Sequence, residues 1–575
     1  MSNTKISIHP LEKIALSCSG GGYRAASYHL GAMSYLNRLN YQGKPLLENV
    51  KMISTVSGGT ITGIVYALGK AHKDEFETIF NFLISQLKQL DLVKAGISQL
   101  NPDAVWTNAT KSKNLINAFA LQYDEHLTRH ATIADLDLSH THLEAAVFNT
   151  TEFTNAVDFR FRNKAAGYCG NFYLKVDAAT AAETRLGDVM AASSCFPGGF
   201  EPILWPQDFV HDQAPRLKAL AAANKPTGLM DGGIYDNQGI SSILNYRKND
   251  AEPYFDLIIV SDVASPYMEA YQPVPEAAKT GFYKWTLKDL AARSASVSNR
   301  ASYVLLGIVL LGLIIPVFTQ YRLNFGNGLS LGFAAASLIL WIGKVLAVKR
   351  LRAALSWTFD RLTQKIPGFY RDKLAHLHVE DLSLHRIEPL VLNRLVSLVD
   401  LLMNVFLKVV RRLNYNILYH NPAFDYRRIG NLIKQLTEED FVNSRERLKQ
   451  DGGPDPNVAE HSVLTGTYQE VIGPELQKIS EEAAGFGTTL WFTDQDVVSD
   501  MLDKLIITGQ ATMCYNLVEY LEQLIYTTGN GFAALPAEGQ QAIQETYDQC
   551  KTDWKKFREA PGFMLKPGPQ EQGKG

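Results

Sequence analysis

Two long uncharged stretches near the middle of the chain constrain its fold more than any other feature of the sequence. Ala301–Tyr321 and Leu323–Gly343 each run for 21 residues without a charged side chain, and only Arg322 separates them. At about 1.5 Å per residue, a helix of that length crosses roughly 30 Å of hydrocarbon. The alternative is a pair of helices buried in a core, because Pro316 shortens the more apolar stretch. We favour the membrane over the core.

Charge around these stretches indicates how they lie in a membrane. Residues 291–302 and 344–352 contain no acidic residue, and the basic residues that flank the stretches are Arg293, Arg300, Lys344, Lys349, Arg350 and Arg352. Because loops rich in Lys and Arg stay in the cytoplasm, both ends of the pair belong there. We therefore predict a transmembrane hairpin over residues 291–350, with helices at about 302–320 and 328–348. The chain is then an integral membrane protein with its N-terminal domain on the cytoplasmic face, at the inner membrane if the cell is bacterial.

The first 290 residues alternate apolar runs, glycine turns and helical patterns. Ile14–Cys18 is predicted to be a strand and is followed by Ser19–Gly22, after which apolar residues recur at spacings of three and four. Met52–Val56 is a second such run, followed by Ser57–Gly59 and another helical pattern. Strand, tight turn and helix in repetition are typical of an α/β fold with a mainly parallel sheet. We predict such a domain over residues 1–290.

The remaining chain is mostly helical in pattern. Residues 351–480 are basic, and a wide apolar face recurs there at Val391, Leu392, Leu395, Val396, Val399, Leu402, Val405, Phe406, Val409 and Val410. Such a face either lies against anionic lipid headgroups or packs inside the fold, and we favour packing inside. Residues 481–560 form a further segment, and 561–575, rich in Gly, Pro, Lys and Gln, are predicted to be disordered.

Charge and cysteine content argue against several classes of protein. The net charge of −3 gives no global reason to expect a nucleic-acid partner. The five cysteines include no C-x-x-C pair, which argues against a disulfide framework and against a structural zinc site. We therefore expect a reducing cytoplasm, no nucleic acid and no metal.

A glycine cluster, Gly20, Gly21 and Gly22, follows the first predicted strand and opens a helix, with Arg24 just inside it. Glycines let backbone amides approach a ligand closely, and a helix N-terminus adds positive potential. This pattern suits either a bound phosphate or a developing oxyanion. It does not match the dinucleotide fingerprint, because the G-x-G-x-x-G spacing is not evident, nor a P-loop, because no lysine follows.

Ser57 stands between the second predicted strand and its helix, in the run Thr55-Val56-Ser57-Gly58-Gly59. A serine at a sharp strand-to-helix turn is held exposed and needs small neighbours, because strand and helix crowd there. The usual pattern is G-x-S-x-G, and here Thr55 replaces the first glycine. Taken alone, the pattern leaves an ordinary turn serine open as an alternative to a nucleophile.

Asp231 precedes Gly232 and Gly233, so its carboxylate can project from a tight loop with little steric shielding. A Ser–His–Asp triad would also need a histidine, and none of the 13 histidines lies in an obvious motif. A serine that is activated directly by an aspartate removes that need. Asp236 is the competing carboxylate, and we favour Asp231.

Together these residues resemble the patatin-like phospholipase family, which includes the cytosolic phospholipase A2 catalytic domains. That family carries a G-G-G-x-R motif, a G-x-S-x-G serine and a D-G-G/A aspartate, and this chain has the three in the same order. The resemblance covers about residues 12–265, with a fainter echo at 488–523. It implies a three-layer α/β fold into which about 270–480 are inserted, with 481–560 completing the catalytic domain and a largely helical C-terminal region.

The resemblance also implies a site for acyl-ester hydrolysis. Ser57 is then the nucleophile and Asp231 its base, in a serine–aspartate dyad. The oxyanion hole would comprise Gly20, Gly21, Gly22 and Arg24. The turn that carries the serine, called the nucleophile elbow below, would comprise Thr55, Val56, Gly58 and Gly59, and the base loop Gly232 and Gly233.

A dyad tied to the cytoplasmic leaflet implies phospholipase A or lysophospholipase activity on membrane phospholipids, with no metal or organic cofactor. A neutral-lipid lipase is the nearest enzymatic alternative. The other class is a membrane interaction protein or toxin-like effector, whose hydrolase domain is regulated or serves as a scaffold. The sequence leaves homo-oligomerisation and an unknown activator open.

Overall fold

The computed structural model describes residues 7, 9–106, 108–247, 253–263, 271–273, 281–318, 325–364, 382–450 and 452–565. The chain divides into two compact units. One, called the catalytic unit below, combines residues 1–268 with 401–575, and the other, called the hairpin unit, spans 269–400. The hairpin unit is therefore inserted within the sequence of the catalytic unit.

A mixed sheet of ten strands forms the centre of the catalytic unit. Eight of them run in the order β12-β11-β1-β4-β5-β6-β7-β8, and off this path β10 pairs with β5 and β9. The strand bounds are β1 Ile14–Cys18, β4 Val50–Val56, β5 Ala145–Glu152, β6 Val157–Arg162, β7 Cys169–Gly170, β8 Lys175–Val176, β9 Ile203–Trp205, β10 Thr227–Asp231, β11 Leu257–Asp262 and β12 Arg428–Leu432. The five strands from β12 to β5 pair in parallel, whereas β6 to β10 pair antiparallel. The predicted mainly parallel α/β sheet is confirmed. A separate hairpin of two short strands joins β2 Asn40–Tyr41 to β3 Lys44–Pro45.

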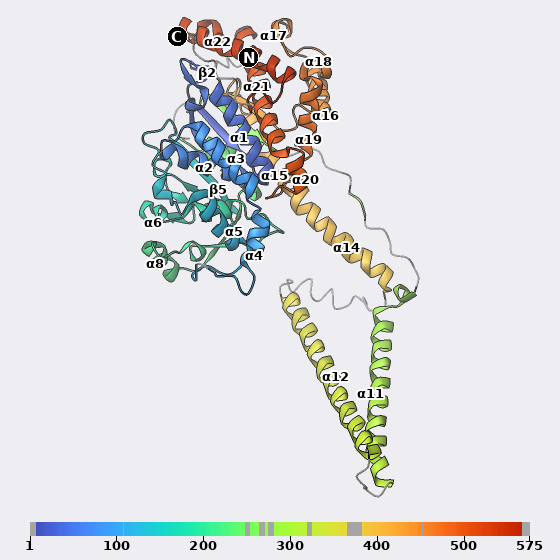
Figure 1. The fold of residues 1–575 in the computed structure, drawn as a ribbon. Helices are drawn as coiled ribbons and strands as arrows, with labels where there is room; N and C mark the ends of the chain where they lie inside the picture. The colour runs from blue at the N-terminus through green and yellow to red at the C-terminus, as the bar shows by residue number, and fades with distance from the viewer. Residues whose placement is uncertain are drawn as a thin grey trace. The chain divides into compact units, whose positions relative to one another are not determined.

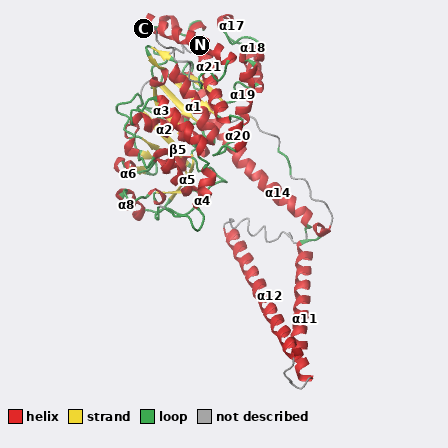
Figure 2. Cartoon of the chain, viewed as in Figure 1, coloured by secondary structure: helices red, strands yellow, loops and turns green. Residues whose placement is uncertain are grey.

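Helices surround this sheet (Figure 1 and Figure 2). In the first half they are α1 Gly22–Arg38, α2 Gly58–Ala71, α3 Phe76–Gln89, α4 Leu92–Gln99, α5 Leu115–Tyr123, α6 Ala178–Ala182, α7 Leu186–Ser193, α8 Pro215–Ala223, α9 Gly233–Asp236 and α10 Ile240–Leu244. After the hairpin unit they are α15 Leu407–Tyr419, α16 Glu438–Gln450, α17 Pro456–His461, α18 Tyr468–Ile472, α19 Pro474–Gly485, α20 Asp494–Val498, α21 Met501–Tyr526 and α22 Ala537–Glu559.

Both faces of the sheet are buried. Successive strand residues point to opposite faces, so Leu16 of β1 lies in the larger apolar cluster and Ala15 in a smaller one. Helix α2 contributes Ile64 to the larger cluster, while α10 and α15 contribute Ile243 and Leu418 to the smaller. Burial on both faces explains why the strands are nearly continuous apolar runs in the sequence.

The region after the hairpin unit completes the sheet and its larger apolar cluster. Within the segment 351–480, where we predicted only helices, β12 pairs in parallel with β11 at the edge of the sheet. Helix α21 lies against α1, as Figure 1 shows, and is buried along most of its length. The prediction missed β12 because one of its two buried positions is the polar Asn431, so burial alternates along the strand but apolar residues do not.

The hairpin unit contains three described helices, α11 Leu287–Phe318, α12 Phe325–Gln364 and α14 Leu384–Asp400. Helices α11 and α12 lie against each other. Their apolar windows, Ser298–Ile315 and Leu329–Arg350, are long and apolar enough to cross a membrane, yet only 6% and 11% of the two windows are buried. By length and composition both helices are candidate membrane spans, and such low burial does not fit the alternative of a pair of core helices.

The apolar face that begins at Val391 is exposed. At least a third of each of these side chains is accessible: Val391, Leu392, Leu395, Val396, Val399, Val405, Phe406 and Val409. Our preference for a helix packed inside the fold is therefore wrong for this face. The helical spacing was read correctly, but neither unit buries its own part of this face.

The predicted disordered tail begins too early. Residues 561–565 form turns, and the Phe563 ring lies 4.8 Å from that of Phe557 on α22, measured between centroids. Arg38 of α1 stacks over the same ring at 5.1 Å. An aromatic residue that packs on a helix outweighs a Gly- and Pro-rich composition here. Residues 566–575 lie outside the described residues.

Candidate active site

Ser57 occupies a sharp turn between β4 and α2. Its backbone angles are φ 50° and ψ −121°, and its residue surface is only 8% exposed. A non-glycine residue with positive φ is strained, and such strain is tolerated where a serine must project from a strand-to-helix elbow. A Cβ atom at Gly58 would overlap the carbonyl oxygen of Gly22, and one at Gly59 would overlap that of Cys18. The two glycines are therefore required by the close approach of this turn to the start of α1.

A buried hydroxyl network fixes the elbow. Thr55, which stands where the usual pattern has glycine, places its Oγ1 3.0 Å from Oγ1 of Thr60. That hydroxyl lies 2.9 Å from Oγ of Ser193, which accepts the Ser57 amide at 2.9 Å. Ser193 Oγ in turn donates to the carbonyl oxygen of Asn149 at 2.8 Å. Thr55 therefore takes part in holding the nucleophile elbow in place.

Strand register brings Asp231 to the serine. On β5, Asn149 pairs with Val56, which is the last residue of β4. The next residue of β5, Thr150, pairs with Asp231, which is the last residue of β10. The ends of β4 and β10 therefore meet along one side of β5. Ser57, which directly follows Val56, lies beside Asp231 closely enough for its side chain to lower the pKa of that carboxyl.

Asp231 is a buried carboxyl with a raised pKa. Burial raises its pKa to about 6, against the opposing effects of the Gly233 amide and the Ser57 side chain. The Gly233 amide donates to Oδ1 at 2.7 Å, and the Asp231 amide donates to the Cys195 carbonyl at 2.9 Å. Gly232 donates to the carbonyl of Ser193 at 3.4 Å, so both base-loop glycines hold the carboxyl in place.

The competing carboxylate, Asp236, has a different environment. Its oxygens accept the backbone amides of Gln238, Gly239 and Ser241, at 3.2, 3.0 and 2.6 Å. These bonds close the turn before α10 and occupy the carboxylate. The structure therefore favours Asp231 over Asp236 as the partner of Ser57.

The glycine loop supplies two amides beside the serine. The Gly20 amide is used, because it donates to the carbonyl of Asn237 at 3.1 Å. Gly21 and Gly22 have φ angles of 150° and 60°, and within the described parts of the chain neither amide has a hydrogen-bond partner. A Cβ atom added at Gly20 would lie 3.0 Å from Cβ of Ser57, which places the loop against the elbow. Two amides at a helix N-terminus can stabilise negative charge that develops next to Ser57.

The contacts of Arg24 are structural. Its Nη1 donates to the carbonyl of Phe486 at 2.6 Å, while the neighbouring Tyr23 amide donates to the carbonyl of Thr489 at 2.8 Å. Burial lowers the pKa of Arg24 to about 10, with Asp262 opposing and Arg411 adding to this effect. Arg24 thus joins the glycine loop to the segment after α19, and its predicted place in the oxyanion hole stays a prediction.

Sequence reasoning missed the residues that position the predicted ones. Ser193 is followed directly by Ser194, and nothing local distinguishes the hydroxyl of one from that of the other. Asn149 holds the elbow through Nδ2, which donates to the Thr55 carbonyl at 2.9 Å. Among the residues that the structure describes, no group of three or more His, Cys, Asp or Glu side chains could hold a metal ion.

Comparison with known proteins gives a family-model match over part of the chain. Residues 16–244 match the family model described as patatin-like phospholipase, so the predicted resemblance is confirmed there. Human GIVD cytosolic phospholipase A2 is similar at 12% identity and a TM-score of 0.32, with 45% of this chain and 44% of that chain covered. A structure of the same human protein in complex with the inhibitor methyl gamma-linolenyl fluorophosphonate and terbium chloride is similar at 13% identity and a TM-score of 0.26. That match covers 45% of this chain and 42% of the other. The chain thus spans under half the length of these structures. No curated protein matches it.

Proposed function

We propose that this chain, in which residues 16–244 are a patatin-like phospholipase domain, hydrolyses fatty-acyl esters of phospholipids or lysophospholipids at the membrane surface. The observation that carries the proposal is the meeting of Ser57, on a strained turn, with the buried carboxyl of Asp231. The amides of Gly21 and Gly22, which have no hydrogen-bond partner among the described residues, lie beside them and complete a site for acyl transfer.

The first half of the reaction forms an acyl-enzyme. Asp231 accepts the proton of Ser57 as Oγ attacks the ester carbonyl carbon, and the carbonyl oxygen becomes an oxyanion. The amides of Gly21 and Gly22 donate to this oxyanion, and each donor of this kind contributes roughly 2.7–4 kcal/mol to the barrier reduction. The intermediate then collapses, the ester C–O bond breaks, and the leaving alcohol takes the proton from Asp231.

The second half restores the enzyme. Water attacks the acyl carbon while Asp231 accepts one of its protons, and the second tetrahedral intermediate expels Ser57 Oγ, which recovers that proton. A fatty acid is released. A carboxyl with a pKa of about 6 suits both steps, because it is mostly ionised near neutral pH and is still basic enough to accept a proton.

The hairpin unit supports a membrane substrate. If α11 and α12 span the bilayer with the flanking basic residues in the cytoplasm, the catalytic unit is tethered to the cytoplasmic leaflet. Tethering raises the effective concentration of phospholipid at the site without any new contact. It favours phospholipase A or lysophospholipase activity over hydrolysis of soluble esters.

Fatty-acid release from mixed micelles tests the proposal. The full chain in detergent is given phosphatidylcholine, lysophosphatidylcholine or triacylglycerol, and wild type is compared with Ser57→Ala, Asp231→Asn and Ser98→Ala. Ser98 lies exposed on α4 and serves as the matched serine control. We expect Ser57→Ala and Asp231→Asn to lose activity by roughly 10³-fold or more, with Ser98→Ala unchanged.

Each other outcome has a meaning. Equal release by wild type and Ser57→Ala would contradict the assignment of the nucleophile. Release from triacylglycerol alone would make the chain a neutral-lipid lipase. No release from any lipid, together with leakage of vesicles that contain the chain, would favour the membrane-effector alternative.

Membrane insertion is tested separately by alkaline carbonate extraction of cell membranes. The full chain should remain with the membrane pellet. Leu310→Arg with Ile339→Arg places one charge in each candidate span, at about 2.5–3.5 kcal/mol per charge for insertion, and should move the protein to the soluble fraction. Extraction of the wild-type chain by carbonate would contradict the proposed spans.

A further inference from the structure

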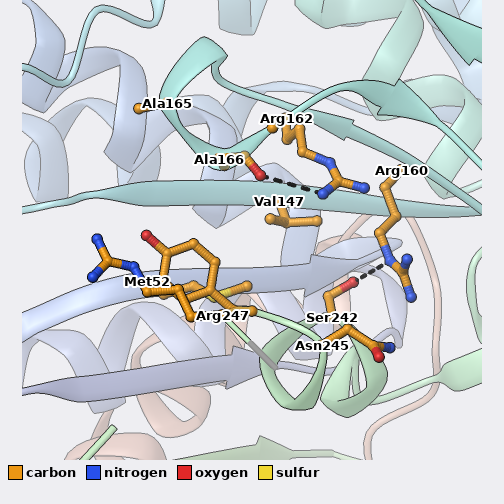
Figure 3. A pocket seen from close by; sticks show the side chains of 11 residues that line it. Met52, Val147, Arg160, Arg162, Ala165, Ala166, Ser242, Asn245 and Arg247 are labelled. Carbon is orange, nitrogen blue, oxygen red and sulfur yellow. Dashed lines mark hydrogen bonds between the residues drawn. The ribbon is translucent and has the colours of Figure 1, made fainter. Parts of the chain in front are cut away.

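A cavity of about 280 Å³ lies in the catalytic unit, and none of its lining residues belongs to the candidate active site. Met52 of β4 and Val147 of β5 line it, and both belong to the smaller apolar cluster, on the sheet face that α10 covers. Figure 3 shows the two arginines of β6, Arg160 and Arg162, on one side of this cavity and Arg247 across it.

Three guanidinium groups reach the cavity, two from β6 and one from the turn after α10. Arg160 and Arg162 alternate along β6 with buried phenylalanines, so both point to the same face. Arg247 follows α10, and its side chain is about half exposed. Such a convergence of like charges is costly unless the charges are compensated, either by carboxylates or by a ligand.

Carboxylates compensate only part of this charge. Arg160 pairs with Asp158, and Arg247 lies 3.8 Å from Glu144, which also accepts the Tyr254 hydroxyl. Arg162 has no carboxylate partner among the described residues.

Among the described residues, the Arg162 guanidinium donates only to the backbone carbonyl of Ala166, at 3.3 Å, and its buried Nε has no hydrogen-bond partner. The same group stacks over the Tyr168 ring at 5.3 Å. Burial and the neighbouring Arg160 lower the pKa of Arg162, with Cys169, Tyr168 and Asp158 opposing. One positive charge in the cavity is therefore left without a carboxylate counterion among the residues that the structure describes.

The remaining lining suits a small ligand with a polar head. Asn245 brings a side-chain amide that can donate a hydrogen bond, and Met52 and Val147 form an apolar wall. The volume is near the lower end of small-molecule sites, which favours a small metabolite or a headgroup over a polymer. Phosphate, with at least three oxygens to share, matches several guanidinium forks better than a carboxylate does.

We propose that this cavity binds the phosphate group of a small phosphorylated molecule, held chiefly by Arg162 and Arg247. The phosphate belongs either to a soluble phosphomonoester or to a lipid headgroup. This site goes beyond the proposed hydrolase function and does not depend on it. Its negative charge would pair with Arg162, a partly buried arginine that has no carboxylate partner among the described residues.

The site is connected to the nucleophile elbow. Arg160 Nε donates to Ser242 Oγ at 2.7 Å, as Figure 3 shows, and Ser242 Oγ donates to Asn149 Oδ1 at 2.6 Å. Asn149 in turn holds the Thr55 carbonyl. A phosphate that draws Arg160 toward itself therefore acts on the elbow through three successive hydrogen bonds. This consequence, a change in hydrolysis rate, rests on the proposed function.

Binding is measured first, in the full chain with Ser57→Ala so that no probe is consumed. Calorimetry compares glycerol 3-phosphate with glycerol for the soluble source. Micelles that contain phosphatidic acid are compared with diacylglycerol micelles for the lipid source. We expect saturable, phosphate-dependent binding in one arm, weakened tenfold or more by Arg162→Ala and by Arg247→Ala. Arg216→Ala, exposed on α8, is the matched control and should bind normally.

The exposed position of Arg247 keeps the test independent of folding, and the ligand-free melting temperature checks Arg162→Ala. Absence of phosphate-dependent binding in both arms would overturn the site, as would unchanged binding by both variants. The rate of phosphatidylcholine hydrolysis is then measured with and without the bound probe. Binding without a rate change would overturn the connection to the elbow while leaving the site intact.

Discussion

Replacing Asp231 by asparagine should abolish hydrolysis and yet stabilise the fold. The carboxyl is buried beside Ser57, and burial raises its pKa from 3.8 to about 6. A difference of about two between the folded and unfolded pKa corresponds to at most about 3 kcal/mol in the free energy of unfolding. The folded protein loses this stability when the carboxyl ionises. Asparagine keeps an acceptor for the Gly233 amide, bonded at 2.7 Å, but carries no charge to desolvate. Asp231→Asn should therefore gain up to about 3 kcal/mol at neutral pH.

The stability difference between wild type and Asp231→Asn should depend on pH. Because the folded pKa of Asp231 lies above the unfolded value, the folded state binds more protons between pH 4 and 6, and wild type loses stability as the pH rises through that window. Melting temperatures of both proteins in detergent should therefore be close below pH 4, diverge from pH 4 to 6 and stay apart above pH 7. Asp137→Asn is the control, because Asp137 is exposed and its hydrogen bonds to Ser139 lower its pKa. An Asp231→Asn protein no more stable than wild type at pH 7.5 would refute the reasoning.

Three further predictions follow from single contacts. The rate of hydrolysis should rise with pH through about 6, because Asp231 must be ionised to accept a proton, and a rate that falls over this range would exclude it as the base. Ser193→Ala removes the acceptor of the Ser57 amide and should lower kcat with a cost of about 1–3 kcal/mol in stability, measured by kinetics and denaturant unfolding. Arg411→Ala leaves buried Asp262 without the partner that it has at 2.8 Å and should destabilise by about 3–5 kcal/mol, and a melting temperature equal to that of wild type would count against that ion pair.

The residues predicted for the chemistry leave a signal in the sequence because each lies at the end of a strand. Ser57 and Asp231 are flanked by glycines that the close approach of the backbone requires, and that requirement leaves a local signal in the sequence. The parallel sheet could be predicted from the sequence for a similar reason, since strands buried on both faces are short apolar runs between glycine turns.

The supporting contacts could not be predicted from the sequence, because they depend on pairing between distant segments. That β10 continues beyond the end of β4 along β5 is a matter of register, which no local pattern reports. Arg24 finds its partner at Phe486, in a segment that comes after the hairpin unit. The exposed apolar face from Val391 could not be told from a core helix, because helical spacing shows that a face is apolar but not what covers it.

The most direct test of the central claim is mass spectrometry of the chain after reaction with an alkyl fluorophosphonate, which phosphonylates activated serines. Wild type in phospholipid micelles should gain one phosphonyl group per chain, on the peptide that contains Ser57, and hydrolysis should fall in proportion. Asp231→Asn should react far more slowly. Modification of a different serine with loss of activity, or full activity after Ser57 is modified, would contradict the account.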